Sequence, residues 1–533
     1  MKYYTVTFKP DGSKVSIHGG TTILEAAGRA GIIFNTICGG KGICGKCRVE
    51  LEADGRKVLA CRHRIESNLE VIIPPQAKFF EPRMLAHGID RGITMGPAIR
   101  KRFPQFVDPA SGMFGVALDI GTTTVVAKLI DLADGACRAT AGAANPQIAY
   151  GDDVISRISY AESEAGLKKL HTAVIECVNS LIVQLCEQVD ITPSDICEVV
   201  AVGNTTMNHL FLKFPIKQLG QAPYKAHSVK AHDHDAQELK LNINPAGNIH
   251  TVENIKSFVG SDTTAVAVAV GMDEAEKMTL VVDIGTNGEL ILGTRDKMYA
   301  TSCAAGPAFE GARISQGSMA IDGAIERVAM AGNDIVWDVI GGGAPRSICG
   351  SGLIDAVALL LNLGIVDISG RFIEPDKSKV KIPQARLARL IKQDRQRAFI
   401  LAHNKDNDND PVVLTQQDLR ETQLAKAAIR TGIRLLQEKV GVTDNDIEQI
   451  FLAGAFGNYI QRESAVRIGL LPNVGAEKIR FVGNAAAVGA QMILLSSRCR
   501  RLCAELTKKI EYVETAREPE FQTIFAESLM FDG

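Results

Sequence analysis

The stretch GVALDIGTTTVVAKLIDL, residues 115–132, places two apolar runs on either side of a short polar turn. The first run ends at Asp119 and Ile120, and Gly-Thr-Thr-Thr leads into the second, a pattern that predicts two strands joined by a tight turn. The stretch LVVDIGTNGELILGT, residues 280–294, has the same order of apolar run, Asp-Ile-Gly-Thr and apolar run. Two copies in one chain predict a duplicated half-domain.

An apolar strand that runs into Gly-Asn and a helix also occurs twice. The two sequences are VVAVGNTTMNHLFL at 199–212 and IRFVGNAAAVGAQMILL at 479–495. We interpret them as the later part of the same repeat.

The chemistry of the two Asp-Ile-Gly-Thr turns is phosphate binding. Such a turn offers backbone N–H groups and hydroxyls to phosphate oxygens, and an Asp at the strand end can hold hydrated Mg²⁺. We therefore expect Asp119 and Asp283 to act at a phosphate-bound Mg²⁺. One copy alone equally suits an ordinary hairpin turn, but two copies with matched flanks favour a nucleotide clamp. The expected phosphate-contacting residues are Gly121, Thr122, Thr123, Thr124, Gly285, Thr286, Asn287 and Gly288.

With IFLAGAFGNYI at 450–460, these segments resemble the actin-like ATPase superfamily of sugar kinases, Hsp70 and actin. The resemblance implies ATP as ligand, phosphate loops at 119–124 and 283–288, and an adenosine contact at 453–457. It also implies that Gly-Asn at 203 and at 483 marks the two helices that connect the halves. The expected adenosine-contacting residues are Gly454, Ala455, Phe456 and Gly457. The sequence has no P-loop motif, so the ATP prediction depends on this set of segments together.

Near the start of the chain, CGGKGICGKC at 38–47 opens a C-x5-C-x2-C-x13-C spacing. Cys38, Cys44, Cys47 and Cys61 could ligate zinc or an iron–sulfur cluster, or include a thiol redox pair. Three ligands in one glycine-rich loop favour a cluster, because backbone N–H groups can then approach its sulfides.

The flanks of this loop support that choice. They predict a hairpin, a helix and, after the loop, a second hairpin, an order that resembles the plant-type [2Fe–2S] ferredoxins. The spacing between the first two cysteines differs by one residue from the plant-type C-x4-C-x2-C spacing. The fourth cysteine also lies closer to the third than in the plant-type proteins.

The composition is that of an ordinary globular chain of 533 residues with net charge −2. It has no long Lys/Arg run, which argues against nucleic acid or an anionic membrane as partner. The start lacks the apolar region of a signal peptide, and no apolar run approaches about 18 residues. We therefore expect a cytoplasmic protein. The eight remaining cysteines are scattered among apolar residues, as buried thiols would be.

The combination of an N-terminal [2Fe–2S] domain, a linker and an actin-like ATPase resembles the reductive activators of corrinoid proteins. Further motifs that carry this resemblance are CAAGPAFEGARISQGSMAIDGAIERV, ICGSGLIDAVALLL and TQQDLRETQLAKAAIRTGI. The resemblance implies an oxidoreductase that uses ATP, Mg²⁺ and a [2Fe–2S] cluster to reduce Co(II) to Co(I) on a corrinoid protein of a methyl-transfer system. It also implies a low-potential electron donor of the ferredoxin or flavodoxin type. A related group with C-terminal [4Fe–4S] clusters fits less well, because the C-terminal region offers only Cys499 and Cys503.

The expected architecture is α/β, in four parts. Residues 1–78 form a β-grasp ferredoxin-like domain, 79–112 a linker, 113–273 the first actin-like half and 274–533 the second. The polar stretch at 403–411 has Asp/Asn spacing that suits calcium, but it lacks the required Gly and distal Glu. We interpret it as a surface loop.

Several residues leave alternatives open. Asp262 either caps a helix or positions water near the γ-phosphate, as a catalytic residue would. Glu310 and Arg313 either face nucleotide or partner, or belong to a mobile surface loop. Cys303 and Cys349 could hold a second cluster across a homodimer, although buried thiols are the simpler expectation. His209 is expected to be packed.

Three other functions are considered. An activator that delivers electrons to another metalloenzyme, such as a 2-hydroxyacyl-CoA dehydratase, is the nearest. An actin-like phosphotransferase would have no use for an iron–sulfur domain. An Hsp70-like binding protein would need a peptide-binding module after the ATPase, and the C-terminal tail is too short for one.

Overall fold

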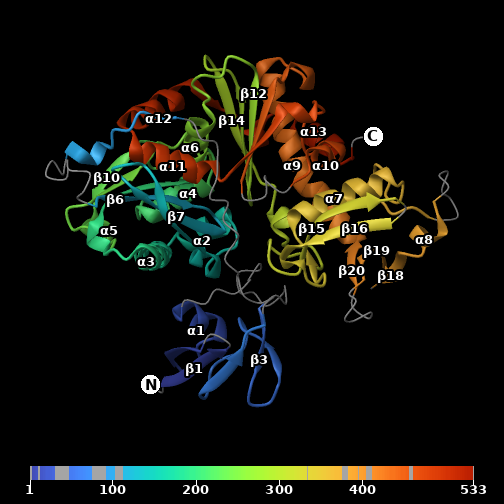
Figure 1. Cartoon of the computed structure of the whole chain (residues 1–533), viewed down its shortest axis with the longest axis horizontal. Helices are drawn as coiled ribbons and strands as arrows, with labels where there is room; N and C mark the ends of the chain where they lie inside the picture. Colours follow the sequence, from blue (N-terminus) through green and yellow to red (C-terminus); the bar gives the residue numbers. More distant parts are fainter. Residues whose placement is uncertain are drawn as a thin grey trace.

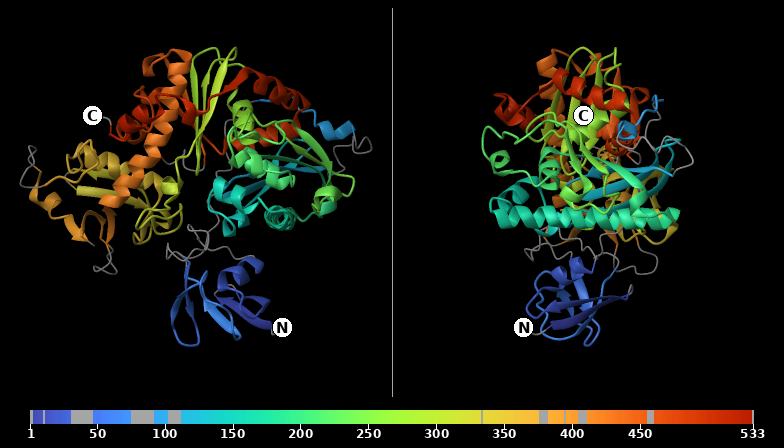
Figure 2. Two further views of the ribbon diagram at one scale, coloured as in Figure 1. Left: turned by 180° about the vertical axis from the view of Figure 1, so that it is seen from behind. Right: turned by 90° about the vertical axis from the view of Figure 1, so that its left-hand side faces the viewer.

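The computed structural model describes residues 3–9, 12–30, 47–74, 92–101, 112–332, 334–374, 382–393, 395–403, 411–454 and 460–531. A small N-terminal domain is followed by two larger α/β units, each built on a six-stranded sheet (Figure 1). We call the two units the first half and the second half. Figure 2 shows the N-terminal domain apart from both halves.

The N-terminal domain is a mixed five-stranded sheet with a helix packed against it. Its strands lie in the order β2-β1-β5-β3-β4, with β1 antiparallel to β2 and parallel to β5. Both predicted hairpins, β1–β2 and β3–β4, are present. This arrangement confirms the β-grasp fold. The elements are β1 (Tyr3–Lys9), β2 (Ser13–His18), α1 (Ile23–Arg29), β3 (Arg48–Leu51), β4 (Lys57–Leu59) and β5 (Leu69–Ile72).

The first half has the strand order β10-β11-β9-β6-β7-β8. Its central strand β6 is buried along nearly its whole length, as its apolar sequence predicts, and pairs in parallel with β9. The elements are β6 (Phe114–Ile120), β7 (Thr124–Asp131), β8 (Cys137–Ala144), α2 (Val154–Tyr160), α3 (Glu164–Val189), β9 (Ile196–Gly203), α4 (Thr205–Phe211), β10 (His232–Asp235), α5 (Ala236–Leu239), β11 (Asn248–Thr251) and α6 (Ser261–Val270).

The second half has the order β22-β21-β12-β13-β14-β23. Its elements are β12 (Thr279–Ile284), β13 (Gly288–Gly293), β14 (Met298–Cys303), α9 (Gln416–Val440), β21 (Gln449–Ala453), α10 (Arg462–Arg467), β22 (Ile479–Gly483), α11 (Ala485–Leu495), α12 (Ser497–Lys509), β23 (Ile510–Tyr512) and α13 (Phe521–Ser528). Two three-stranded sheets are inserted between β14 and α9, on the right in Figure 1. The elements of this inserted segment, sheets and helices together, are β15 (Ala324–Ala331), β16 (Asp334–Val339), β17 (Ser347–Ile348), α7 (Gly350–Asn362), α8 (Gln384–Leu387), β18 (Leu390–Gln393), β19 (Gln396–Ala402) and β20 (Val412–Thr415).

The two sheets show the predicted duplication, but the strands that correspond between the halves differ from those we predicted. β6 pairs in parallel with β9, and β12 pairs in parallel with β21, so β9 corresponds to β21. The next strand outward is β11 in the first half and β22 in the second. Our pairing of 199–212 with 479–495 is therefore wrong, because β9 and β22 occupy different places.

The shared Gly-Asn sequence has a local cause. Asn204 and Asn484 each cap a helix, accepting hydrogen bonds from the backbone N–H of Met207 at 3.0 Å and of Ala487 at 2.9 Å. This is ordinary helix-start chemistry and occurs wherever a strand turns into a helix.

The two helices that pack against each other between the halves are α6 and α11. Our prediction was right for the helix after 483, which is α11, and wrong for the helix after 203, which is α4. A Cβ atom on Gly489 of α11 would lie 2.1 Å from the backbone oxygen of Ala265 of α6, so the two helices touch along their backbones. Glycine is required at this crossing, because any side chain would push the helices apart.

Residues 92–101, within the expected linker, pack on the end of α11. Gly96 forms a parallel bridge with Ser496: its N–H donates to Leu495 O at 2.8 Å, and its carbonyl accepts from Ser497 N at 3.0 Å. Ile99 is buried in the core that α6 and α11 share. Residues 92–101 of the predicted linker therefore pack with the two halves.

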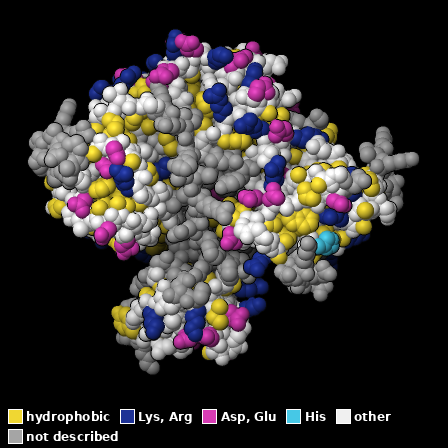
Figure 3. Space-filling view, viewed as in Figure 1, with side chains coloured by type: hydrophobic (Ala, Val, Ile, Leu, Met, Phe, Trp, Pro, Cys, Tyr) yellow, Lys and Arg dark blue, Asp and Glu magenta, His cyan; other side chains and the backbone are white. Residues whose placement is uncertain are grey.

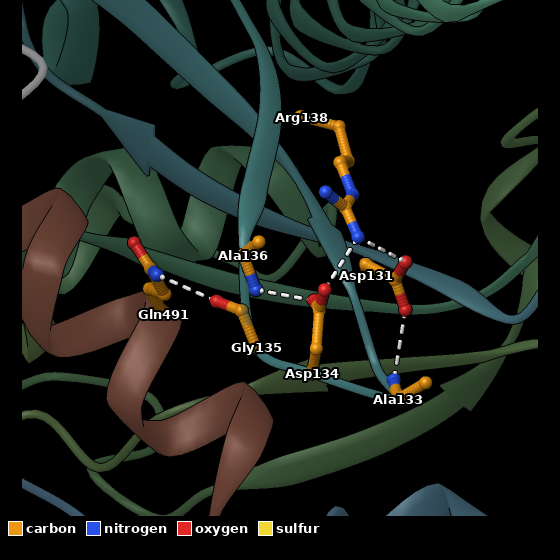
Figure 4. A network of polar contacts seen from close by, with 7 residues as sticks. All are labelled: Asp131, Ala133, Asp134, Gly135, Ala136, Arg138 and Gln491. Atoms are coloured by element: carbon orange, nitrogen blue, oxygen red, sulfur yellow. Dashed lines mark hydrogen bonds and ion pairs between the residues drawn. The ribbon is translucent and has the colours of Figure 1, made fainter. Parts of the chain in front are cut away.

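The turn between β7 and β8 lies against the same helix (Figure 4). Gln491 of α11 donates to Gly135 O at 3.4 Å, and Arg138 pairs with Asp131 at 2.9 Å and also with Asp134. α11 thus contacts the first half at its turn as well as at its crossing helix.

Charges of both signs are interspersed on the face shown in Figure 3, in keeping with the net charge of −2. Among the described residues, no helix is both long and apolar enough to cross a membrane.

Candidate functional site

A cavity of about 160 Å³ lies between the two halves. The first half contributes Asp119, Gly121, Thr122, Thr123, Thr124, Val126, Lys128, Thr140, Asn204 and Asp262 to its lining, and the second half contributes Asp283, Ile284, Gly285, Thr286, Asn287, Glu289, Glu310, Met319, Gly454, Asn484 and Ala486. We call it the central cavity. It brings together all the described residues that the sequence predicted for nucleotide binding except Gly288.

The first predicted phosphate loop follows β6 directly. Asp119 is the next-to-last residue of that strand, and the turn closes with Gly121 N donating to Thr124 O at 2.8 Å. Asn204, at the end of β9, donates to the hydroxyl of Thr122 at 2.9 Å and fixes the loop from the neighbouring strand.

The second predicted loop follows β12 in the same way. Asp283 is again the next-to-last strand residue, and Gly285 N donates to Asn287 O at 2.9 Å. Gly288 does not reach the cavity. A Cβ atom there would lie 2.9 Å from the Ile429 side chain, so this glycine allows α9 to pack against β13.

The two loops touch across the cavity. The hydroxyl oxygens of Thr123 and Thr286 lie 2.7 Å apart. Each hydroxyl also contacts the Glu310 carboxyl, at 3.1 Å from Thr123 and 2.8 Å from Thr286. Of the two alternatives for Glu310, the structure places it in the cavity.

Gly454 lies at the end of β21, where the predicted adenosine turn begins. Its φ of +99° is one that glycine tolerates best, and a Cβ atom would lie 2.4 Å from Ile284 O and 3.0 Å from Asp283 Oδ1. Gly203, at the corresponding end of β9, would bring a Cβ atom within 2.6 Å of Ile120 O. The same close approach is therefore repeated in both halves. Ala455, Phe456 and Gly457 lie outside the described residues.

Asp262 lines the cavity but does not cap α6. The N-cap is Gly260, and the Asp262 carboxyl accepts hydrogen bonds from its neighbour Thr263, at 2.7 Å from the backbone N–H. The capping alternative is therefore wrong, since the helix begins at Ser261, two residues earlier than that alternative requires.

Three aspartates give the cavity its acidic character. Burial raises the pKa of Asp119 to about 6, against the opposing effect of a hydrogen bond from Asn484. Burial raises the pKa of Asp262 to about 7. Burial raises the pKa of Asp283 to about 8, and the charges of Asp262 and Asp119 add to the effect.

Two glutamates and one lysine complete the charged lining. Burial raises the pKa of both Glu289 and Glu310, and it lowers the pKa of Lys128. Among the described residues, five carboxyl groups and a single amine line the cavity. When these carboxyl groups are ionised they repel a polyphosphate, and a divalent cation between them would compensate the charge.

Sequence reasoning missed Lys128, Glu289 and Asn484 as site residues. Lys128 carried a signal, because it interrupts the apolar strand 124–131 and is only 2% exposed. Glu289 sits similarly in the apolar run of β13. Asn484 was noted only as part of Gly-Asn. Its amide donates to Asp119 Oδ2 at 3.0 Å and links the halves.

In the N-terminal domain, Cys47 and Cys61 lie in the core with their Sγ atoms 3.3 Å apart. This distance is too long for a disulfide of about 2.05 Å. It is close to the separation of about 3.8 Å expected for two thiolates on one tetrahedral metal. The pair therefore suits two ligands of one iron. Cys38 and Cys44 lie outside the described residues, and in the described part of the chain no three His, Cys, Asp or Glu side chains are arranged around a metal position.

The remaining candidates are structural. His209 is buried, contacts Thr205 O at 2.7 Å and has its pKa lowered to about 4 by burial, so it is packed as expected. Cys303 and Cys349 are buried thiols. Arg313 does not line the central cavity. The predicted surface loop at 403–411 falls mostly outside the described residues.

Comparisons with known proteins assign all three parts of the chain. The family model described as "2Fe-2S iron-sulfur cluster binding domain" matches residues 8–66, "RACo middle region" matches 114–275, and "C-terminal domain of RACo the ASKHA domain" matches 277–533. The last description confirms the actin-like fold class.

Two relatives and one solved structure extend this match. The chain is 33% identical to "Corrinoid activation enzyme RamQ" of Eubacterium limosum, over 97% of each chain. It is 26% identical to "[Co(II) methylated amine-specific corrinoid protein] reductase" of Methanosarcina barkeri, over 75% of this chain and 73% of that protein. The solved "Reductive activator for corrinoid,iron-sulfur protein" superimposes with a TM-score of 0.74 at 31% identity, covering 99% of this chain and 98% of that one. The chain therefore belongs to the family of reductive activators of corrinoid proteins.

Proposed function

We infer that the chain carries out the ATP-dependent reductive activation of a corrinoid protein, adding one electron to Co(II) to give Co(I). The observation that carries this inference is the combination of two sites in one chain: the Cys47–Cys61 pair in a β-grasp domain, and a cavity closed by two Asp-Ile-Gly-Thr loops. The family supports the same conclusion.

A [2Fe–2S] cluster would be held by Cys38, Cys44, Cys47 and Cys61, and it supplies single electrons at low potential. Cys47 and Cys61 suit two of these ligand positions, because both are buried, their Sγ atoms are close together and they form no disulfide with each other. The protein around the pair excludes water from that side, since both thiols lie in the apolar core of the domain.

The central cavity would hold ATP with Mg²⁺. Hydroxyls of Thr122, Thr123 and Thr286 and backbone N–H groups of the two loops face the position of the phosphates. Asp119 and Asp283 would direct carboxylates at the hydrated metal. Asp262, freed from a capping role, would orient the attacking water.

ATP is needed because the reduction runs uphill. A plant-type cluster has a potential of about −400 mV, and each ~59 mV of one-electron mismatch costs about a factor of ten. A clamp that closes on ATP can bind the Co(II) form of the partner and, within that complex, alter the coordination of the cobalt so that the bound Co(II) becomes easier to reduce. ATP would then leave the cluster's own potential nearly unchanged, while the partner would stimulate hydrolysis, because the two binding events are linked.

The partner of this chain would be a corrinoid protein of a methyl-transfer system, and the electrons would come from a low-potential donor of the ferredoxin or flavodoxin type. The corrinoid partner is supported by the named relatives. The donor follows from the chemistry, because a donor of comparably low potential is needed to keep the cluster reduced.

The experiment mixes the reduced protein and Mg-ATP with a Co(II) corrinoid protein and follows Co(I) by its optical absorption. We expect an ATP-dependent rise that is lost without nucleotide. The cluster potential, measured with and without ATP, should not move. If Co(I) does not rise with any corrinoid partner, the activator of a different metalloenzyme becomes the better conclusion.

A further inference from the structure

Glu310 occupies a position in the central cavity that the nucleotide mechanism does not explain. It ends the short helix Pro307–Glu310, which follows β14 and lies between two glycines of positive φ, Gly306 at +75° and Gly311 at +76°. At Gly311 a Cβ atom would lie 2.2 Å from Ser318 O. The backbone that carries Glu310 is therefore tightly fixed.

The carboxyl contacts one hydroxyl from each half. Thr286 Oγ1 lies 2.8 Å from one carboxyl oxygen, Thr123 Oγ1 lies 3.1 Å from the other, and the two hydroxyls are 2.7 Å apart. These three groups form a closed ring of three contacts. The hydroxyls are the same donors that the loops would offer to a phosphate.

Counting protons fixes the state of this ring. Two threonine hydroxyls supply two protons, and an ionised carboxylate supplies none, so one of the three oxygen pairs would face each other without a proton. A protonated Glu310 supplies the third, and each contact then becomes a hydrogen bond. Burial raises the pKa of Glu310, which favours the protonated form.

The ring also occupies both hydroxyl protons, which are the donors that a phosphate oxygen would need. A phosphate can therefore accept hydrogen bonds from these hydroxyls only after the ring opens and they release the carboxyl.

We propose that Glu310 is an internal competitor of the nucleotide phosphates: it bridges Thr123 and Thr286 in the nucleotide-free protein and must be displaced before ATP binds. The inference rests on the proposed function, since it assigns the two loops to phosphate. Glu310 thereby sets the affinity of the site for nucleotide through the positions of the two loops.

Two substitutions separate this competition from simple charge repulsion. Glu310→Ala removes the bridge and should tighten Mg-ATP binding about tenfold, which corresponds to about 1.4 kcal/mol. Glu310→Gln cannot ionise, yet it keeps one donor and one acceptor, so it can complete the same three-bond ring. It should leave the affinity unchanged or weaken it.

The measurement is the dissociation constant of Mg-ATP for the full-length protein and both variants, by titration calorimetry at pH 7. Glu289→Gln serves as the matched control, because it neutralises another buried carboxyl of the same cavity that touches neither threonine. If Ala and Gln at position 310 tighten binding equally, repulsion explains the effect and the competition is refuted. If the unaltered protein binds no Mg-ATP at all, the nucleotide assignment itself fails.

Discussion

The side-chain amide of Asn484 donates a hydrogen bond of 3.0 Å to Asp119, although the two residues are 365 positions apart in the chain. The same asparagine caps α11 through its other amide atom, accepting from Ala487 N at 2.9 Å. One side chain therefore starts the crossing helix of the second half and orients a carboxyl of the first. The bond also opposes the effect of burial on the pKa of Asp119.

Asn484→Ala should lower both stability and ATP hydrolysis. Loss of the cap costs about 1 kcal/mol, and loss of the amide raises the pKa of Asp119 further and leaves its carboxyl unoriented. Ser163→Ala is the matched control, because Ser163 caps α3 at 3.0 Å and is not part of the cavity lining. Thermal unfolding should shift similarly in both variants, and only Asn484→Ala should reduce turnover. Equal turnover in the two would contradict a role in the site.

Asp119→Ala and Asp283→Ala should each abolish Mg-dependent ATP hydrolysis, since each removes a carboxylate aimed at the phosphate-bound metal. The visible absorption of the cluster should be unchanged, because the cysteines belong to a different domain. Steady-state phosphate release and the absorption spectrum of the same preparation test both parts. Wild-type turnover in both variants would mean that the loops do not bind phosphate.

Asp262→Asn should reduce turnover more than nucleotide affinity. The substitution keeps the size of the side chain and, since Gly260 is the cap of α6, removes no helix cap. We expect a fall in kcat of at least about a hundredfold, as for loss of a general base, with a dissociation constant for Mg-ATP within a few-fold of the original. A purely structural Asp262 would instead show lowered thermal stability with normal kcat.

The stability of the nucleotide-free protein should fall as pH rises. Asp283 has an ordinary pKa of 3.8 in the unfolded chain and a pKa of about 8 when folded. Between about pH 4 and pH 8 the folded protein thus holds a proton that the unfolded chain has lost, so the free energy of unfolding decreases across this window.

Asp283→Asn should remove part of this dependence. The variant should unfold at a higher temperature than the natural protein at pH 8 without Mg²⁺ or nucleotide, and the difference should shrink at pH 5. Asp338→Asn, on the exposed strand β16, provides a surface control. A stability gain that is the same at both pH values would show that the buried proton is not the cause.

Cys61→Ala should remove the iron–sulfur cluster and leave ATP binding intact. The purified natural protein should hold about two irons and two sulfides per chain and show a rhombic EPR signal once reduced. Cys137→Ala is the control, because Cys137 is exposed on β8, outside the N-terminal domain. Stoichiometric zinc without acid-labile sulfide in the natural protein would rule out the cluster.

Local patterns predicted those parts of the structure that local chemistry determines. Asp119 and Asp283 lie where the Asp-Ile-Gly-Thr turns placed them, because strand, turn and strand are encoded within about ten residues. Asn204 and Asn484 misled the repeat assignment, since a helix cap looks the same wherever a strand meets a helix. The place of a strand in a sheet depends on pairing with distant strands, which no local pattern records.

The same dependence on distant contacts explains why some side chains of the cavity were not predicted as site residues. Lys128 and Glu289 lie in strands, where successive side chains face opposite sides of the sheet. Which side faces the cavity is decided by how the halves pack. Residues 92–101 carried no periodicity, and their bridge to Ser496 joins positions about 400 residues apart.

The bridge between Gly96 and Ser496 limits how far the iron–sulfur domain can travel. The described chain ends at Pro74 on one side and resumes at Gly92 on the other, with residues 75–91 between them. Covalent geometry allows such a stretch to span at most about 60 Å. The N-terminal domain is therefore confined to a sphere around a fixed point on the ATPase surface. A partner docked beyond that radius would bind and yet receive no electron from the cluster.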